Sequence, residues 1–378
     1  MARVFEGKLS DLLAIQYLID AYPPEVVEHA VAITGRAGTR TRMLPPPLVV
    51  YLVLAMCLFP DAGYEQVCQL LGQCPALPDR WQVGPPATAP STAAVSRARV
   101  RLGSPPLREL LAWAIAGRGR AWCPGTGYRR WRLRTMDGYV AAVPYSQAAV
   151  TVRPPGRGAP GSRPGRAGIR ISVLADDETS QLIAADVSAD NSPAEVPVEL
   201  AGALGRGDLL LAAGDYARPG LWRRAAATGA DLLCSVPAAV PPATGELLAD
   251  GSRLCVPRGG GWVSPGTPVR VLGGVSPGPR ALVTTILDPA AAPAAELTAV
   301  HRRRRRFRQA EVFREQADLP IRSRSREMAE QEIWGHLLVH AALRRPAAAA
   351  APGAAGRWAL SLLFKVPACG SSSSVPRA

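Results

Sequence analysis

The sequence predicts an α/β protein in which an N-terminal helical domain precedes a mixed sheet flanked by helices, with a β-rich insertion in the sheet. Apolar residues recur at helical spacing through the first 120 residues, and from Trp131 the pattern changes to β-rich runs. Several adjacent runs are followed by a strand–helix–strand repeat, which is typical of a mixed sheet. At 378 residues, the chain can bury a sizeable core.

The first 120 residues predict helices, several of them introduced by proline, which is favoured in the first helical turn. The apolar run Leu48–Phe59 has 12 residues, fewer than the roughly 20 that span a bilayer, so it indicates a buried helix and no membrane role. The predicted helices are Leu9–Ile19, a helix that starts at Pro24 and stops at Gly35, Leu48–Leu58, Tyr64–Leu71, Ala94–Leu102 and Pro106–Ala116.

The β-rich part continues to about Pro289, where a helical pattern resumes at Pro293 and runs, with a break near Pro320, to Leu343. Between Pro237 and Pro289, short β-like runs broken by Gly and Pro predict the insertion. The predicted strands before it are Arg132–Val143, Ile169–Leu174, Gln181–Val187, Asp208–Ala213 and Asp231–Val236, with helices at Pro193–Leu204 and Pro219–Ala227.

These patterns predict three regions. A helical domain occupies residues 1–120, and a sheet domain occupies 121–345 with its insertion at about 238–289. The tail 346–378 is rich in Ala, Pro, Gly and Ser, a composition that predicts disorder.

The chain is strongly basic, with a formal net charge of +14. Lys8 and Lys365 are the only lysines among 44 basic residues, so 44 − 2 = 42 are arginines. Arginine binds phosphate through paired hydrogen bonds, so this charge favours a nucleic-acid partner. A GC-rich coding sequence also produces such an excess, and that explanation stays open. The arginines gather in Arg36–Arg42, Arg97–Arg101 and Arg302–Arg306.

The seven cysteines form no Cys-x-x-Cys pair, so they indicate neither a disulfide framework nor a zinc site. This usage predicts a reducing, cytoplasmic location. The sequence also lacks a Gly-x-Ser-x-Gly nucleophile elbow and a Gly-x-x-x-x-Gly-Lys phosphate loop. These absences disfavour Ser/His/Asp hydrolysis, and nucleotide hydrolysis by a phosphate loop is not expected.

Asp137 is a carboxylate within the first predicted strand, directly before Gly138. Nucleases that use two metal ions need acidic side chains from separate elements, because hard cations such as Mg²⁺ prefer oxygen ligands. Asp137 is a candidate for such a ligand. A structural alternative is an edge-strand or bulge aspartate beside the glycine.

Taken as a whole, the chain around Asp137 resembles the insertion-sequence-four transposases. The motifs that carry the resemblance are Ala21–Val27, Leu48–Phe59, Asp137-Gly138, Asp208–Leu211, Leu221–Leu233, Arg322–Arg326 and Gln331–Gly335. The resemblance implies a ribonuclease H-like fold, an Asp-Asp-Glu site, Mg²⁺ or Mn²⁺ as cofactor, and DNA strand cleavage and transfer. It also implies double-stranded transposon-end DNA as partner, a homodimer on that DNA, and association with the nucleoid.

The chain departs from the family pattern at two of the three acidic positions. The second aspartate falls on Ala213, two residues before Asp215, and the glutamate falls on Ala310, one residue before Glu311. We therefore expect a degenerate copy, in which any surviving catalytic and metal-binding set is Asp137, Asp215 and Glu311. The predicted DNA contacts are Arg306, which matches the family arginine, and Arg303, Arg97 and Arg101.

Two other classes remain open. One is a non-catalytic DNA-binding protein derived from a transposase, in which the arginine clusters bind phosphate and the sheet is a scaffold. The other is a structural α/β protein whose charge reflects codon usage. Metal-dependent DNA cleavage would separate an active transposase from both.

Overall fold

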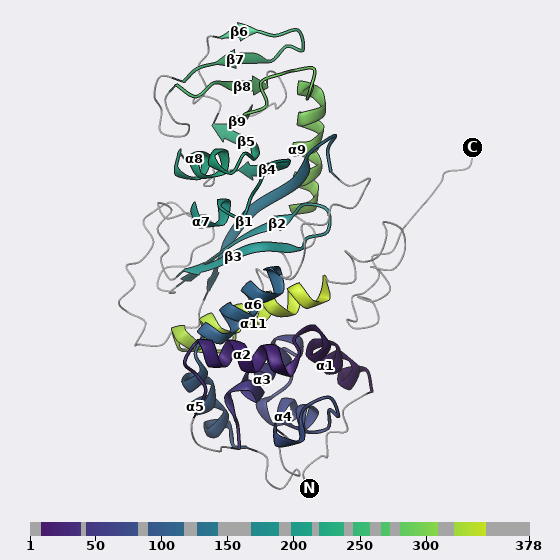
Figure 1. Ribbon diagram of the computed structural model, residues 1–378, viewed down its shortest axis with the longest axis vertical. Coiled ribbons are helices and arrows are strands. Elements are labelled where there is room, and N and C mark those ends of the chain that lie inside the picture. The colour runs from purple at the N-terminus through teal and green to yellow at the C-terminus, as the bar shows by residue number, and fades with distance from the viewer. Residues whose placement is uncertain are drawn as a thin grey trace, which may run out of the picture.

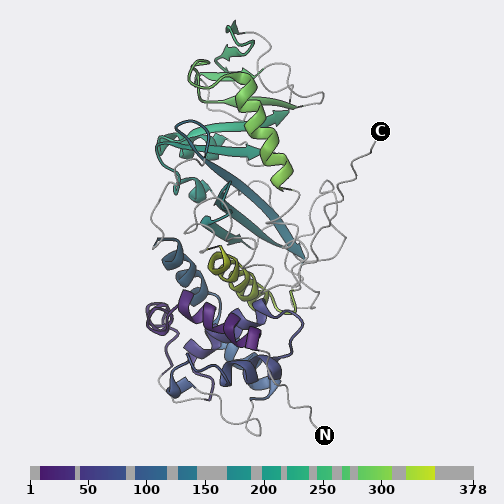
Figure 2. The same cartoon turned by 90° about the vertical axis from the view of Figure 1, so that its right-hand side faces the viewer.

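A computed structural model describes residues 9–38, 43–81, 90–116, 127–142, 168–188, 198–213, 219–237, 245–257, 266–272, 280–308 and 321–344. The predicted disordered tail lies outside these residues. Helices gather at one end of an elongated molecule and a sheet at the other (Figures 1 and 2). Among the described helices, none is long and apolar enough to cross a membrane.

The N-terminal helices confirm the prediction from apolar spacing. In α3 every residue from Leu48 to Leu58 is buried, so the apolar run is a central core helix. Both α2 and α3 have proline in their first turn, and Ser91 caps α5 by accepting a hydrogen bond from the backbone N–H of Ala94. The elements are α1 Leu9–Ala21, α2 Pro24–Ile33, α3 Pro46–Leu58, α4 Tyr64–Gly72, η1 Asp79–Trp81, α5 Thr92–Leu102 and α6 Pro105–Ala116.

One sheet of nine described strands forms the other end, in the order β3-β2-β1-β4-β5-β9-β8-β7-β6. The strands are β1 Arg132–Ala142, β2 Gly168–Asp176, β3 Leu182–Ser188, β4 Asp208–Ala213, β5 Asp231–Pro237, β6 Glu246–Leu247, β7 Arg253–Cys255, β8 Val269–Leu272 and β9 Arg280–Thr284.

The first five strands have the ribonuclease H-like arrangement. Strands β1, β2 and β3 are antiparallel neighbours, and β4 and β5 then continue the sheet parallel to β1. The predicted fold class is confirmed. Strands β6 to β9 extend the same sheet beyond β5, so the predicted β-rich insertion is confirmed as a continuation of one sheet (Figure 1).

Helices cover both faces of the sheet, because alternate side chains of buried strands point to opposite faces. On β4, Leu210 and Ala212 belong to one apolar cluster with α7 Val198–Ala201 and α8 Pro219–Ala227. Leu209 and Leu211 belong to the opposite cluster, against α9 Ala294–Arg308. Of the helix predicted over Pro193–Leu204, the described part is the short α7.

The helix α11 Arg326–Leu343 packs against α3 and α6, among the N-terminal helices. It also touches β3, and Ile169, Ile171 and Val173 of β2 join the same apolar core. The helical end and the sheet therefore share one contact surface, in which α11 lies between them (Figure 1). The domain limits at 120 and 345 stay a prediction.

Gly335 allows α11 to approach α3 closely. A Cβ at this position would lie 2.7 Å from Sγ of Cys57 and 3.0 Å from Cγ1 of Val53. We expect Gly335→Ala to lower the free energy of unfolding by about 1–3 kcal/mol, the usual cost of overpacking. Denaturant unfolding measures it. The double variant Gly335→Ala/Cys57→Ala should recover much of the loss, and equal loss in both backgrounds would contradict the steric explanation.

Candidate nuclease site

Asp137 lies on β1, which runs between β2 and β4 in the sheet. Its backbone pairs with Val173 in an unbroken antiparallel register, so the edge-strand or bulge alternative is wrong. On the other side, β1 and β4 are parallel, and the last described pair is Thr135 with Leu211. Parallel strands advance together by the same rise per residue. Two residues further, Asp137 is therefore level with Ala213, the last residue of β4.

The aspartate of β4, Asp208, has a structural role. Asp208 is buried at the start of the strand, and its Oδ1 lies 2.9 Å from Nε of both Arg132 and Arg134. Its Oδ2 accepts the backbone N–H of Gly205 at 2.8 Å. A carboxylate with these partners neutralises two arginines inside the sheet and holds the turn before β4.

The remaining predicted acidic residues, Asp215 and Glu311, lie outside the described residues, as does Ala310. The part of the chain that the structure describes contains no group of three or more His, Cys, Asp or Glu side chains arranged to hold a metal ion. Level with Asp137 stands an alanine, which has no oxygen ligand in its side chain. Of the three predicted metal ligands, the described part of the chain thus includes Asp137 alone.

The structure places the predicted DNA-contacting arginines on two helices. Arg97 and Arg101 are exposed and one turn apart on α5, so they share a face. Arg303 is exposed on α9, where its Nη2 lies 3.3 Å from Oε1 of Glu178 in the turn between β2 and β3. Arg306 is on the same helix as Arg303. The two pairs are not brought into one cluster with Asp137 by any described contact.

Arg99, between the two exposed arginines of α5, is fully buried. The cluster Arg97–Arg101 therefore offers two side chains to solvent, the predicted DNA contacts Arg97 and Arg101. Its partners include Gln331 and Glu332 of α11. Sequence reasoning missed this contact. The sequence offered little signal for it, because Gln331 and Glu332 follow Glu327 and Glu330 in a polar first half of the helix.

A comparison with known families finds a match in the N-terminal part of the chain. Residues 13–112 match the family described as "Insertion element 4 transposase N-terminal". These residues are similar to the N-terminal domain of insertion element 4 transposases. The resemblance inferred from the sequence motifs is therefore confirmed. A comparison with curated proteins finds no match.

Among solved structures, this chain is similar to one described as a piggyBac transposase synaptic complex with hairpin DNA. The identity is 10%, the TM-score is 0.45, and the match covers 96% of this chain and 81% of that one.

Proposed function

We propose that this chain is a DNA transposase of the insertion element 4 type whose strand-cleavage step is impaired by the loss of catalytic carboxylates. The observation that carries the proposal is the register of the central strands, in which Ala213 stands level with Asp137. Metal-dependent phosphoryl transfer needs carboxylates from separate elements at such a place. An alanine removes both negative charge and a fixed ligand.

An active version of this transposase would need Asp137, Asp215 and Glu311 to hold Mg²⁺ or Mn²⁺. Asp215 is two residues beyond Ala213 in the sequence, and two residues of an extended strand span about 6.5 Å. Glu311 is one residue beyond Ala310, and one residue of a helix corresponds to a rotation of about 100°. Functional groups must be held within roughly half an ångström, so these offsets favour the impaired version.

Binding of double-stranded DNA at the transposon ends is the part of the function that survives the loss of carboxylates. Phosphate contacts need positive charge and no divalent ion. The exposed Arg97 and Arg101 on α5 and Arg303 on α9 support this proposal, and Arg306 is assigned the same role by its match to the family arginine. Two protein copies on two DNA ends would form a homodimer.

DNA affinity should fall steeply with salt, because each neutralised phosphate releases counterions. We expect Arg97→Gln/Arg101→Gln to reduce the slope of log K against log salt by up to about 2, since one phosphate contact contributes about 0.9. Fluorescence anisotropy with duplex DNA between roughly 50 and 200 mM salt measures the slope.

The matched control is Arg223→Gln, which removes one positive charge from an exposed position of α8. It should leave the slope nearly unchanged. A flat salt dependence in the wild type would contradict phosphate binding, and a similar slope change per charge in Arg223→Gln would show that only net charge matters.

The second candidate function is DNA binding without any catalysis, and the same arginines support it. A DNA cleavage assay separates the impaired transposase from the non-catalytic DNA-binding protein. Replacing the missing carboxylates restores strand cleavage only if the rest of the catalytic site, Asp137 included, is still competent.

A further inference from the structure

The helix α11 is separated in sequence from the N-terminal helices by the whole sheet, yet it lies among them (Figure 1). Most of its residues are buried, and these include the polar Gln331 and Glu332. A buried carboxylate is costly unless it is paired and hydrogen-bonded. Gln331 meets partners from α5 and the residue that follows it, and Glu332 meets partners from α5 and from the segment 321–325 that leads into α11.

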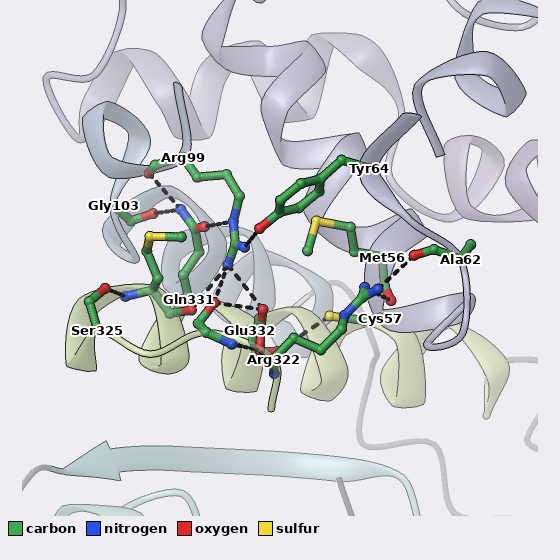
Figure 3. Close-up of polar contacts among 12 residues, drawn as sticks. Met56, Cys57, Ala62, Tyr64, Arg99, Gly103, Arg322, Ser325, Gln331 and Glu332 are labelled. Carbon is green, nitrogen blue, oxygen red and sulfur yellow. Dashed lines mark hydrogen bonds and ion pairs between the residues drawn. The ribbon is translucent and has the colours of Figure 1, made fainter. Parts of the chain in front are cut away.

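Arg99 of α5 is the cationic partner, and Figure 3 shows its side chain reaching toward α11. Its Nε donates to Oε1 of Gln331 at 2.8 Å, and its Nη2 lies 3.4 Å from Oε1 of Glu332. Nη1 donates to the hydroxyl of Tyr64 at 2.8 Å, and Nη2 donates to the hydroxyl of Ser323 at 3.1 Å. One guanidinium therefore joins α4, α5, α11 and the segment before α11.

The Glu332 carboxylate is satisfied by the same segment. Its Oε2 accepts the backbone N–H groups of Arg322 at 2.9 Å and Ser323 at 3.3 Å, and its Oε1 accepts the Ser323 hydroxyl at 2.7 Å. With Arg99 opposite, the carboxylate has a complete set of donors. Removing one partner of such a buried pair strongly destabilises the folded protein.

Side chains of α11 and of the segment before it also donate hydrogen bonds to backbone carbonyls of the N-terminal helices. Nε2 of Gln331 donates to the carbonyl of Gly103 at 2.8 Å, at the end of α5. The guanidinium of Arg322 donates to the carbonyls of Met56 at 2.9 Å and Ala62 at 2.6 Å, near the end of α3. Carbonyls at helix ends have no partner within the helix, so these side chains satisfy groups that the helices leave open.

The C-terminal half of α11 accepts hydrogen bonds from α1 and from Tyr22, the residue that follows α1. The hydroxyl of Tyr17 donates to the carbonyl of Ala342 at 2.7 Å, and the hydroxyl of Tyr22 donates to the carbonyl of Leu338 at 2.6 Å. Contacts thus run along α11 from its first turn to its last.

We infer that residues 9–116 and 321–344 form one cooperatively folded helical domain, into which the sheet of residues 127–308 is inserted. Residues 321–344 are a clasp that closes this domain. On this view α9 and α11, consecutive described helices, belong to different folding units, because α9 packs on the sheet and α11 completes the helical core. The insertion gives the sheet two covalent connections to the helical domain, which limits how far the two parts can swing apart.

Native-state hydrogen exchange of the full wild-type chain at increasing denaturant tests this inference. Amides of α11 should share the exchange free energy and denaturant dependence of α3 and α5, while α9 follows β4 and β5. Exchange of α11 together with α9 and the sheet would overturn the inference. A single common isotherm for helices and sheet would overturn it as well, because no separate helical unit would then exist.

The variants Arg99→Met and Glu332→Gln test the clasp itself. Each should speed exchange in α3, α5 and α11 together by about 100-fold or more, because it leaves a buried group unpaired, and leave β4 and β5 unchanged. Arg97→Met, two residues away on the exposed face of the same helix, is the matched control and should change none of these rates. Acceleration confined to α5 would overturn the clasp, and the wild-type series decides the inference if a variant does not fold.

Discussion

Purified wild-type protein is expected to leave transposon-end DNA essentially uncut in Mg²⁺ or Mn²⁺, whereas the repaired variant Ala213→Asp/Ala310→Glu cleaves it. The loss of a needed carboxylate removes a metal ligand and the charge that accompanies it, which typically costs orders of magnitude in rate. Ala213 stands level with Asp137, and the sequence match places Ala310 at the glutamate position. Gel analysis of end-labelled duplexes that carry the ends of the encoding element measures the cleavage.

Two control variants make this result specific. Ala213→Asn/Ala310→Gln has nearly the same side-chain shapes without the charges, so it should stay inactive. Adding Asp137→Ala to the repaired variant should abolish its cleavage. Robust wild-type cleavage that is abolished by Asp137→Ala would contradict the impaired transposase. If Asp215→Ala or Glu311→Ala in the wild-type protein also abolished that cleavage, the active version of the site would be assigned.

Asp208→Ala is expected to destabilise the protein by about 1–3 kcal/mol, because it removes the carboxylate beside the partly buried Arg132 and leaves Arg134 with Asp176 alone. Asp208 is 2% exposed and lies 2.9 Å from Nε of both Arg132 and Arg134. Denaturant unfolding measures the change in free energy. The exposed Asp61 is the matched control, and Asp61→Ala should change stability by no more than about 0.5 kcal/mol.

This prediction also assigns a structural role to Asp208, the aspartate at the start of β4. In the repaired variant, Asp208→Ala should reduce the amount of folded protein, while the cleavage rate per folded molecule stays unchanged. Wild-type stability combined with loss of cleavage would instead make Asp208 part of the reaction site.

Local patterns were sufficient for the elements and for much of the fold. The apolar run Leu48–Leu58 indicated a buried helix, and alternating or continuous β-rich runs located β1 to β5 within a few residues. The Gly- and Pro-broken stretch between Pro237 and Pro289 indicated the insertion. These features depend on burial period and on backbone restrictions, which act over neighbouring residues and can therefore be recognised in the chain itself.

The sequence by itself thus determined the helices, the strands, the basic character and the motifs of the transposase family. Only the tertiary structure decided which arginine of Arg97–Arg101 is buried, because Arg99 depends on Glu332, more than two hundred residues away. It likewise placed Ala213 level with Asp137 and α11 among the N-terminal helices. Strand register and long-range pairing arise from contacts between distant segments, and no local period encodes which segments meet.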